Sequence, residues 1–530
     1  MLLAIVQGSS KHLVAIFIPL LTNSIIKMIL FFRHFCAGLY VKIKNYLEKN
    51  MRLKFKFRQV VVLVGTALAT IVGLHFFASP ATVVVAAAPV AANQQPFSVP
   101  PSDAPELAPL GAYAVGVRTL TLTNPDQADI PKMVKTLGLA GKSDRVLTVE
   151  VWYPAAASAT TTEKAIYKSS FSRGKDPVKK IEFNYPGIAT REAPPLTLAA
   201  GGARFPLVIV SHGFAGWGTF MSYLTENLAS KGYVVAAIDH ADAPFTDGTS
   251  FALSFGSTLV HRSRDQQFVL SHLTTLAKNE IDALGRLIDA QVVGVIGYSM
   301  GGYGALATAG AGYDAASPTF KQIPSAIMAP VTEGNAQFNE AAAARTKAIK
   351  ALVLIAPWGM QPANRAWTAK SLKAVQAPTM LVVGDQDDVV EYEQGVKHLL
   401  QTMTTTSRHM LVYQNARHNT GGNPPTPEAQ EAFSSREYYD EPVWRKDRLN
   451  AINQHFITAF LDLNLKGIVD RASYLDTPTI KANDAKWPAA FGQVPSGALA
   501  TGTADTEKYW RGFQRRWAIG LEMHRMKAGE

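Results

Sequence analysis

The most constraining feature of the sequence is an apolar run that enters a Gly-x-Ser-x-Gly turn. The run Val292–Ile296 predicts a buried strand, and the small residues of Ala305–Ala309 predict a helix after the turn. At such a junction the serine, Ser299, projects from the end of the sheet. Gly297 and Gly301 have no side chains, so the strand and the helix can approach each other closely. The stretch predicts a nucleophilic serine, with a purely structural turn of another doubly wound domain as the alternative.

Strands and helices alternate around this stretch, which predicts an α/β fold with a mostly parallel, doubly wound sheet and helices on both faces. Continuous apolar runs are typical of strands that are covered on both faces, and they occur at 207–210, 233–238, 351–355, 379–383 and 409–413. Apolar residues at helical spacing predict helices at 221–231, 265–279 and 451–466. The alternating pattern at 145–154 predicts an antiparallel strand at the edge of the sheet.

Three segments are predicted to be additions to a core domain that spans residues 111–467. Insertions are expected near 155–201, which is polar and predicts no regular structure, and near 311–350, which is rich in alanine. Residues 468–530 form a C-terminal extension that we expect to pack on the core domain. Aromatic and aliphatic residues at helical spacing predict a helix over 509–526, with a helix on a membrane surface as the alternative.

Residues 1–92 are predicted to be a leader, followed by a linker rich in Pro, Ala and Ser at 93–110. A basic segment that begins at Met51 precedes the apolar run Val60–Phe77 and small residues suited to cleavage, as in a signal peptide. The run is also just long enough for an uncleaved membrane anchor. We expect export to the periplasm or the outside of the cell, and we hypothesise that translation starts at Met51.

Charge and cysteine content argue against several classes of function. Residues 1–92 hold ten Lys or Arg and one Glu, which leaves 42 basic against 40 acidic residues in the remainder. Nucleic-acid binding therefore has little support. The single cysteine, Cys36, lies in the predicted leader, so we expect no disulfide, cysteine-ligated zinc or cysteine nucleophile beyond it. Metal-ligand spacings, phosphate loops and dinucleotide fingerprints do not occur, so neither a metal nor a cofactor is expected.

A serine nucleophile needs a base, and the base needs an orienting acid. Both residue types follow Ser299 at predicted strand ends. One strand runs into an acidic loop from which we choose Asp387 as the acid, with Asp385 and Asp388 as rivals. The next strand ends in a loop that carries His418, the predicted base. The order Ser, Asp, His agrees with a triad built on successive strands of such a sheet.

An oxyanion formed at the serine needs backbone N–H donors. The N–H of Met300, directly after the nucleophile, is one candidate. The N–H of Phe214 is the other, in the loop Ser211-His212-Gly213-Phe214 that follows an earlier strand. We expect His212 to be a structural hydrogen-bonding residue. No role is assigned to the histidines His240, His261 and His272.

These residues resemble the dienelactone-hydrolase-like branch of the α/β-hydrolases, which neighbours the platelet-activating-factor acetylhydrolases and the bacterial cutinase-type polyester hydrolases. The resemblance covers about residues 145–467 and implies the α/β-hydrolase fold. It depends on four segments: Val151–Pro154, Ser211–Phe214, Ala229–Ala236 and Gly297–Gly302.

The chain departs from each of these relatives in part. Dienelactone hydrolases use a cysteine nucleophile, where this chain has Ser299. The acetylhydrolases place the acid one strand earlier, where this chain has Ile355-Ala356-Pro357-Trp358, whereas the position in polyester hydrolases agrees with Asp387. The polyester hydrolases also carry an Ala-Pro-Trp motif beside the substrate, so the resemblance implies Trp358 as a substrate contact.

We therefore expect a serine carboxylic-ester hydrolase that forms an acyl-enzyme on Ser299, with His418 as base and Asp387 as acid. The expected partner is a small-molecule or lipid-like ester. The alternatives are a polyester or lipid hydrolase proper, a peptidase on the same fold, and a non-catalytic α/β-hydrolase domain that binds a ligand.

Overall fold

The computed structural model describes residues 94–530 except 136–140, 157–162, 173–179, 200, 243–247, 431–432, 488–491, 494 and 502–507. The predicted leader, with Cys36 and the run Val60–Phe77, lies outside the described residues. Among the helices that are described, none is both long and apolar enough to cross a membrane.

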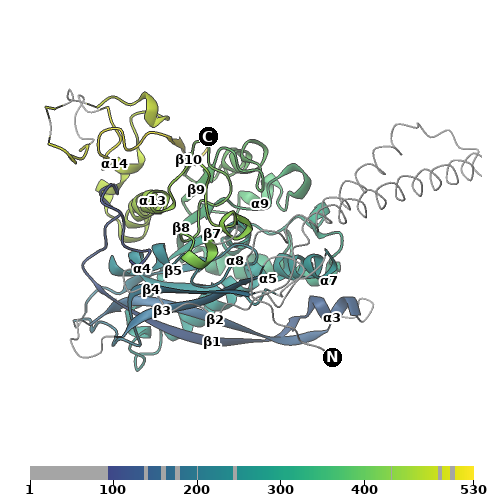
Figure 1. Cartoon of the computed structure of the whole chain (residues 1–530). Coiled ribbons are helices and arrows are strands. Elements are labelled where there is room, and N and C mark those ends of the chain that lie inside the picture. The colour runs from purple at the N-terminus through teal and green to yellow at the C-terminus, as the bar shows by residue number, and fades with distance from the viewer. Residues whose placement is uncertain are drawn as a thin grey trace, which may run out of the picture. The chain divides into compact units, whose positions relative to one another are not determined.

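One sheet of eleven strands organises the described part of the chain, in the order β11-β10-β9-β8-β7-β5-β6-β2-β1-β4-β3 (Figure 1). The six neighbours from β10 to β6 are parallel, while β11, β2 and the pair β3–β4 add antiparallel pairings. The α/β fold predicted from the sequence is confirmed. The strands are β1 (Ala114–Ala128), β2 (Lys142–Ala155), β3 (Lys164–Ser172), β4 (Lys180–Arg191), β5 (Phe205–Ser211), β6 (Val234–Asp239), β7 (Ile288–Tyr298), β8 (Ile349–Ile355), β9 (Thr379–Gly384), β10 (Arg408–Tyr413) and β11 (Leu521–Met526).

Helices cover the sheet on both sides. In Figure 1, α4 and α13 lie on one side of the central strands, and α5 and α8 lie on the other. Helix α5 begins at Gly248, well before the predicted start at residue 265, and packs against α6 and α3. The helices are α3 (Ile130–Lys135), α4 (Ser222–Ser230), α5 (Gly248–Leu276), α6 (Met300–Thr308), α7 (Ser325–Met328), α8 (Ala336–Thr346), α9 (Ala369–Leu372), α10 (His398–Thr402), α11 (Pro427–Gln430), α12 (Phe433–Arg436), α13 (Lys446–Lys466) and α14 (Ala472–Leu475).

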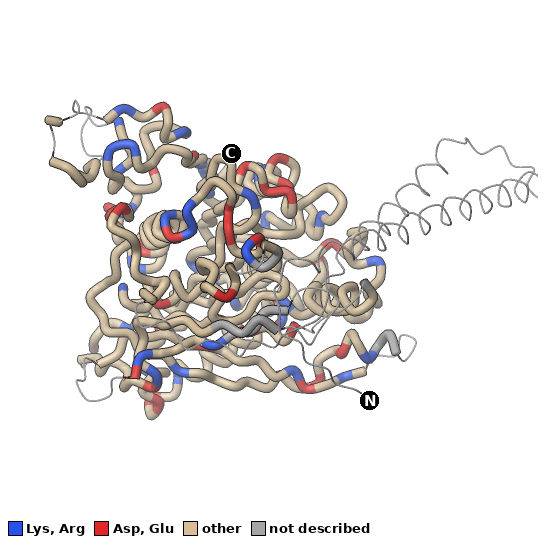
Figure 2. The backbone as a smooth tube through the Cα atoms, in the orientation of Figure 1, with Lys and Arg blue, Asp and Glu red and all other residues tan. Residues whose placement is uncertain are grey.

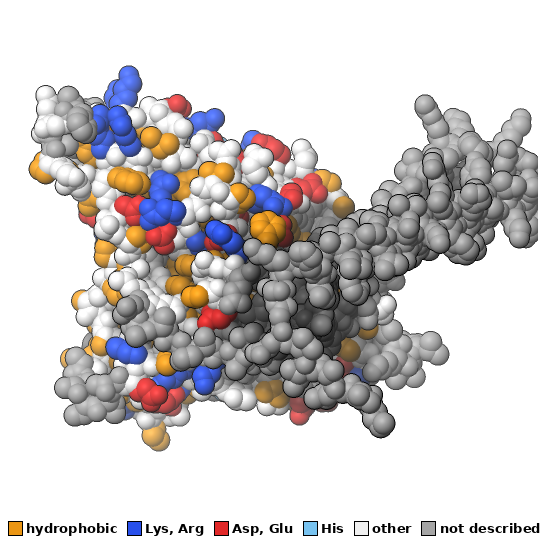
Figure 3. Space-filling model, in the orientation of Figure 1, with side chains coloured by type: hydrophobic (Ala, Val, Ile, Leu, Met, Phe, Trp, Pro, Cys, Tyr) orange, Lys and Arg blue, Asp and Glu red, His pale blue; other side chains and the backbone are white. Residues whose placement is uncertain are grey.

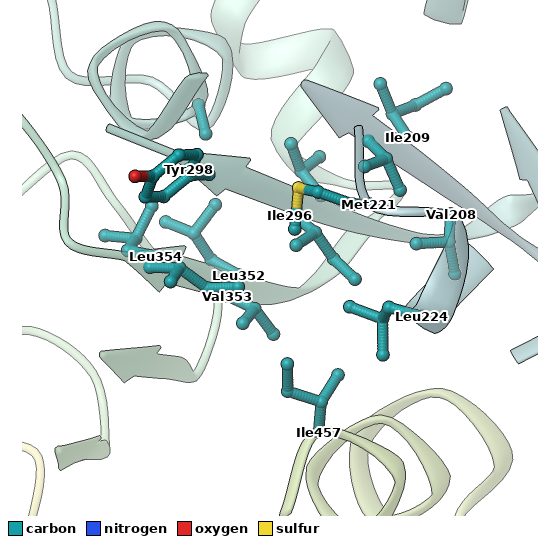
Figure 4. Close-up of a cluster of buried hydrophobic side chains, with 14 of the residues drawn as sticks. Val208, Ile209, Met221, Leu224, Ile296, Tyr298, Leu352, Val353, Leu354 and Ile457 are labelled. Carbon is teal, nitrogen blue, oxygen red and sulfur yellow. The ribbon is translucent and has the colours of Figure 1, made fainter. Parts of the chain in front are cut away.

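The central strands are buried on both faces, as their continuous apolar runs predict. Val208 of β5 lies over Leu224 of α4 and near Ile457 of α13, and all three are at most 1% exposed (Figure 4). Burying a side chain of this size contributes about 1.5–3 kcal/mol relative to leaving it in water. A Cβ on Gly294 of β7 would lie 3.0 Å from Leu465, so the glycine allows α13 to pack close to the sheet. This packing holds the strand ends, where the candidate residues lie, in one rigid layer.

The described part of the predicted linker is bound along its length to the core. Ser98 donates a hydrogen bond of 2.6 Å to the buried carboxylate of Glu226 in α4. The ammonium group of Lys231 donates to the carbonyl of Leu107 at 2.5 Å. Residues 94–113 therefore lie against the domain before the chain enters β1.

The prediction of no regular structure at 155–201 is wrong, because β3 and β4 form an antiparallel pair there and β4 also pairs with β1. The inner positions hold small and aromatic residues, Ala165, Tyr167, Tyr185 and Ala189, instead of an aliphatic run. The predicted edge position of the strand at 145–154 is also wrong, because β1 pairs with its outer side. That strand, β2, lies between β6 and β1.

The predicted helix over 509–526 is also wrong. The segment contains turns and then β11, which pairs antiparallel with β10. Gly512 and Gly520 adopt φ angles of +82° and +92°, which interrupt a right-handed helix. Trp510 and Phe513 are nevertheless buried and contact Phe456 of α13, with ring centroids 6.0 and 5.7 Å apart.

Basic and acidic residues are interspersed along the described backbone (Figure 2). The described side chains on the face in Figure 3 likewise include both signs, with apolar groups between them. This mixture agrees with the near-neutral charge of the chain after residue 92.

A buried histidine makes the stability of the fold sensitive to acid. His409 of β10 is 7% exposed, and neither ring nitrogen has a hydrogen-bond partner among the described residues. Burial, with the charge of Arg525, lowers the pKa of His409 from 6.5 to about 4. The unfolded chain therefore takes up this proton at a higher pH than the folded chain, so the free energy of unfolding falls as the pH falls from 6.5 towards 4.

We expect His409→Phe to reduce this sensitivity, since it removes the titration without removing a hydrogen bond. The loss of unfolding free energy between pH 7 and pH 5 should shrink by about 2 kcal/mol, measured by urea denaturation at both pH values. His272→Phe, at an exposed position of α5, is the control. An equal pH dependence in the His409 variant and the wild type would contradict the prediction.

Candidate active site

Ser299 lies at the turn between β7 and α6 with φ 52° and ψ −114°, a strained conformation for a residue with a side chain. A Cβ on Gly297 would lie 2.3 Å from the carbonyl oxygen of Gly301, and one on Gly301 would lie 2.0 Å from that of Ser211. Both glycines are thus required for close approach, as predicted. The N–H of Ser299 donates to the carbonyl of Ile355 at 2.9 Å, which ties the turn to β8.

The structure brings Ser299, His418 and Asp387 together at the carboxyl ends of β7, β10 and β9. The Ser299 hydroxyl lies 3.0 Å from Nε2 of His418, and Nδ1 of His418 lies 2.8 Å from Oδ2 of Asp387. These are hydrogen-bond distances for a nucleophile, a base and an orienting acid. The arrangement can activate the hydroxyl, because the imidazole can accept its proton and the carboxylate can stabilise the resulting charge.

The three candidate acids have different surroundings. The side chain of Asp387 is fully buried, and its Oδ1 accepts the N–H groups of Val389 and Val390 at 2.9 and 3.0 Å. Asp385 instead accepts the backbone N–H of residue 415 at 2.6 Å, and Asp388 forms an exposed ion pair with the side chain of residue 417. Of the three, only Asp387 is hydrogen-bonded to the candidate base.

Glu441 holds the loop that carries His418, and the sequence reasoning missed it. Its two carboxylate oxygens accept the backbone N–H groups of Arg417 and Asn419, each at 2.6 Å, so it binds the loop on both sides of the base. Lys446 donates to the carbonyl of Asn419. Glu441 is buried, and burial raises the pKa of its carboxyl. It lies in a polar segment without periodicity, so no local signal could have singled it out.

The two residues predicted to supply the oxyanion donors, Phe214 and Met300, lie near Ser299. The loop after β5 passes so close that a Cβ on Gly213 would lie 3.2 Å from Cβ of Ser299, and Phe214 follows in this loop. Met300 begins α6, and first-turn N–H groups have no partner within their own helix. Phe214, Met300 and Ser299 line one cavity.

This cavity has a volume of about 810 Å³ and an aromatic wall. Phe214, Phe251, Phe255 and Trp358 contact one another with neighbouring ring centroids 5.3–6.0 Å apart. The lining also includes charged side chains, among them Arg436 from the segment after β10. A cavity of this size, mostly apolar with a few polar groups, suits a small organic ligand. The structure thus places Trp358 on the wall, as a substrate contact requires.

Two further histidines, His212 and His240, are buried and form their hydrogen bonds with groups other than Ser299, His418 and Asp387. His212 is buried and hydrogen-bonded to backbone groups. His240 lies between Ser211 and Asp265, a second Ser-His-Asp arrangement whose three residues are at most 3% exposed, so substrate cannot reach it. The described residues contain no cluster of His, Cys, Asp or Glu able to hold a metal ion.

Two family models match parts of this chain. The family described as "Platelet-activating factor acetylhydrolase, isoform II" matches residues 111–257, and the family described as "PET hydrolase-like" matches residues 196–320. No curated protein matches the chain. A solved ferulic acid esterase from Streptomyces cinnamoneus aligns with 67% of this chain and 91% of its own, at 21% identity and a TM-score of 0.42. The two family matches confirm the resemblance predicted from the sequence to the acetylhydrolase and polyester hydrolase group.

The hydrogen bond between Asp387 and His418 generates a test of the triad. Asp387→Asn should slow the labelling of Ser299 by a fluorophosphonate about 10³-fold or more, because the amide favours the wrong imidazole tautomer. Asp388→Asn, on the same loop, is the matched control and should label within a few fold of the wild type. The labelling rates are measured by intact-mass spectrometry. Equal rates in the two variants would refute the assignment of Asp387 as the orienting acid.

Proposed function

We propose that the chain is a serine carboxylic-ester hydrolase that forms an acyl-enzyme on Ser299. The observation that carries the proposal is the hydrogen-bonded series Ser299–His418–Asp387, of which Ser299 and His418 line a cavity with an aromatic wall. The two matched families, an acetylhydrolase and a PET hydrolase by description, support the same class of reaction. Export belongs to the proposal as well, supported by the sequence of residues 1–92 alone.

The reaction follows from the roles of the three side chains. His418 accepts the proton of the Ser299 hydroxyl through Nε2 as the oxygen attacks the ester carbonyl carbon. The backbone N–H groups of Phe214 and Met300 donate to the oxyanion of the tetrahedral intermediate. The intermediate collapses, and the alcohol leaves with the proton from His418. Water then attacks the acyl-enzyme with His418 again as base, which releases the acid and restores the serine.

The aromatic wall supports an ester with an apolar acyl or alcohol group. Trp358 and Phe255 present ring surfaces beside the nucleophile, so an apolar group can leave water as the carbonyl reaches Ser299. A polyester or lipid hydrolase proper is the second candidate, favoured by the same wall and by the PET hydrolase-like match. The preferred length of the acyl group in the ester distinguishes these candidates.

The first test compares the wild type with Ser299→Ala on p-nitrophenyl esters from acetate to palmitate. Removing the nucleophile should lower kcat/KM by roughly 10³- to 10⁶-fold, because its attack starts the reaction. Circular dichroism shows whether the variant keeps its fold. If the folded wild type and variant were equally inert on every ester, the proposal would fail, and amide substrates would then distinguish a peptidase from a ligand-binding domain.

A second test concerns the wall of the cavity. Trp358→Leu should raise KM about 5- to 30-fold for the ester that the wild type prefers, because lost aromatic contact weakens ground-state binding. The value of kcat should change less. Trp517→Leu, at a partly exposed position of the C-terminal extension, is the control and should leave both constants unchanged. Unaltered KM values across the series in the Trp358 variant would rule out the contact.

A further inference from the structure

We propose that His212 is a positioning residue for the oxyanion donor: it holds the carbonyl of Gly213 and thereby turns the N–H of Phe214 towards Ser299. The inference deepens the proposed function and rests on it. The hydrogen bonds of this histidine are made with the backbone of Gly213 and His240 and not with the nucleophile or the orienting acid.

The first step is the orientation of one peptide unit. The carbonyl oxygen of Gly213 lies 2.6 Å from Nδ1 of His212 and accepts the N–H of Gly216 at 3.2 Å. In a trans peptide the carbonyl and the following N–H point in opposite directions. Because the carbonyl faces the buried imidazole, the N–H of Phe214 faces the other side, where Ser299 lies against Gly213.

The second step is the tautomer of His212. The backbone N–H of His240 donates to Nε2 of His212 at 3.1 Å, so Nε2 is an acceptor and Nδ1 carries the proton. The imidazole is 2% exposed, and burial, with the charge of Arg262, keeps its pKa well below 6.5. Both ring nitrogens are therefore occupied, which leaves His212 unable to act as a second base.

The third step is the support of His240, which supplies that N–H. Its ring lies between the Ser211 hydroxyl at 2.7 Å and the Asp265 carboxylate at 2.8 Å. Arg145 donates two hydrogen bonds of 2.7 Å to the same carboxylate. Burial opposes ionisation of Asp265, but His240 and Arg145 outweigh it and hold its pKa below the ordinary value. This buried series joins β2, α5, β6 and the end of β5, and it fixes the loop that bears the donor.

The space around the imidazole agrees with this role. A Cβ on Gly216 would lie 2.9 Å from Nδ1 of His212, so the chain leaves room for the ring only because residue 216 is glycine. Gly216→Ala therefore offers a way to displace the ring without replacing it.

The test uses two substitutions that each keep one half of the imidazole. Asparagine can place an amide N–H near the position of Nδ1, so His212→Asn keeps the donor to Gly213. Glutamine reaches the position of Nε2, so His212→Gln keeps that contact and loses the donor. With the best p-nitrophenyl ester, we expect His212→Gln to lower kcat about 10- to 100-fold with KM within threefold, and His212→Asn to stay within about fivefold of the wild type.

A trifluoromethyl ketone gives a readout that depends on the oxyanion. Its adduct with Ser299 carries the negative oxygen, so its inhibition constant should rise in His212→Gln by the factor that kcat loses. Gly216→Ala should show the same pattern, which keeps the test valid if His212→Gln does not fold. His272→Gln, at an exposed site, is the control.

The outcomes separate the inference from the proposed function. An active wild type with kcat and ketone inhibition unchanged in His212→Gln, or with equal losses in the Asn and Gln variants, would overturn the role of His212 alone. A wild type that neither hydrolyses esters nor reacts with a fluorophosphonate would overturn the proposed function and the inference with it.

Discussion

The site depends on the close approach of three backbone segments around Ser299. Gly301 lies so near the carbonyl of Ser211 that a single methyl group would separate α6 from the end of β5. The strained φ of Ser299 persists because the surrounding strands leave the turn no alternative. This contact joins the nucleophile to the loop that carries Phe214, since β5 and β7 are neighbours at the point where the chain order of the sheet reverses.

The two Ser-His-Asp arrangements differ in whether a substrate can reach the serine. Their hydrogen-bond lengths are nearly equal, yet Ser211 is completely inaccessible while Ser299 opens onto the cavity. The buried set also carries Arg145, whose positive charge balances Asp265. Burial, with the charge of Arg262, lowers the pKa of His240 to about 4. One arrangement can move a proton to a substrate, whereas the other can only hold backbone in place.

The sequence was sufficient to predict features that depend on residues close to one another along the chain. The elbow, the buried strands and the residues at strand ends could be predicted because a turn motif and a period of apolar residues lie within one short window. Strands β3 and β4 could not be predicted in this way, because they are stabilised by pairing and by aromatic packing with segments distant in the sequence. In the C-terminal extension a local pattern gave a wrong prediction. Trp510 and Phe513 have helical spacing, but the glycine conformations and the pairing of β11 with β10 prevent a helix.

The role of Glu441 could not be predicted from the sequence. The base His418 could be found from its position after a strand, but its loop is held by a carboxylate from a segment without a pattern. That segment also lines the cavity that has the aromatic wall. The same stretch therefore contacts the loop that carries the base and also lines the cavity, so we expect changes in it to alter the placement of His418 together with the fit of the ligand. No local sequence motif encodes these contacts, because they join segments that are separated along the chain.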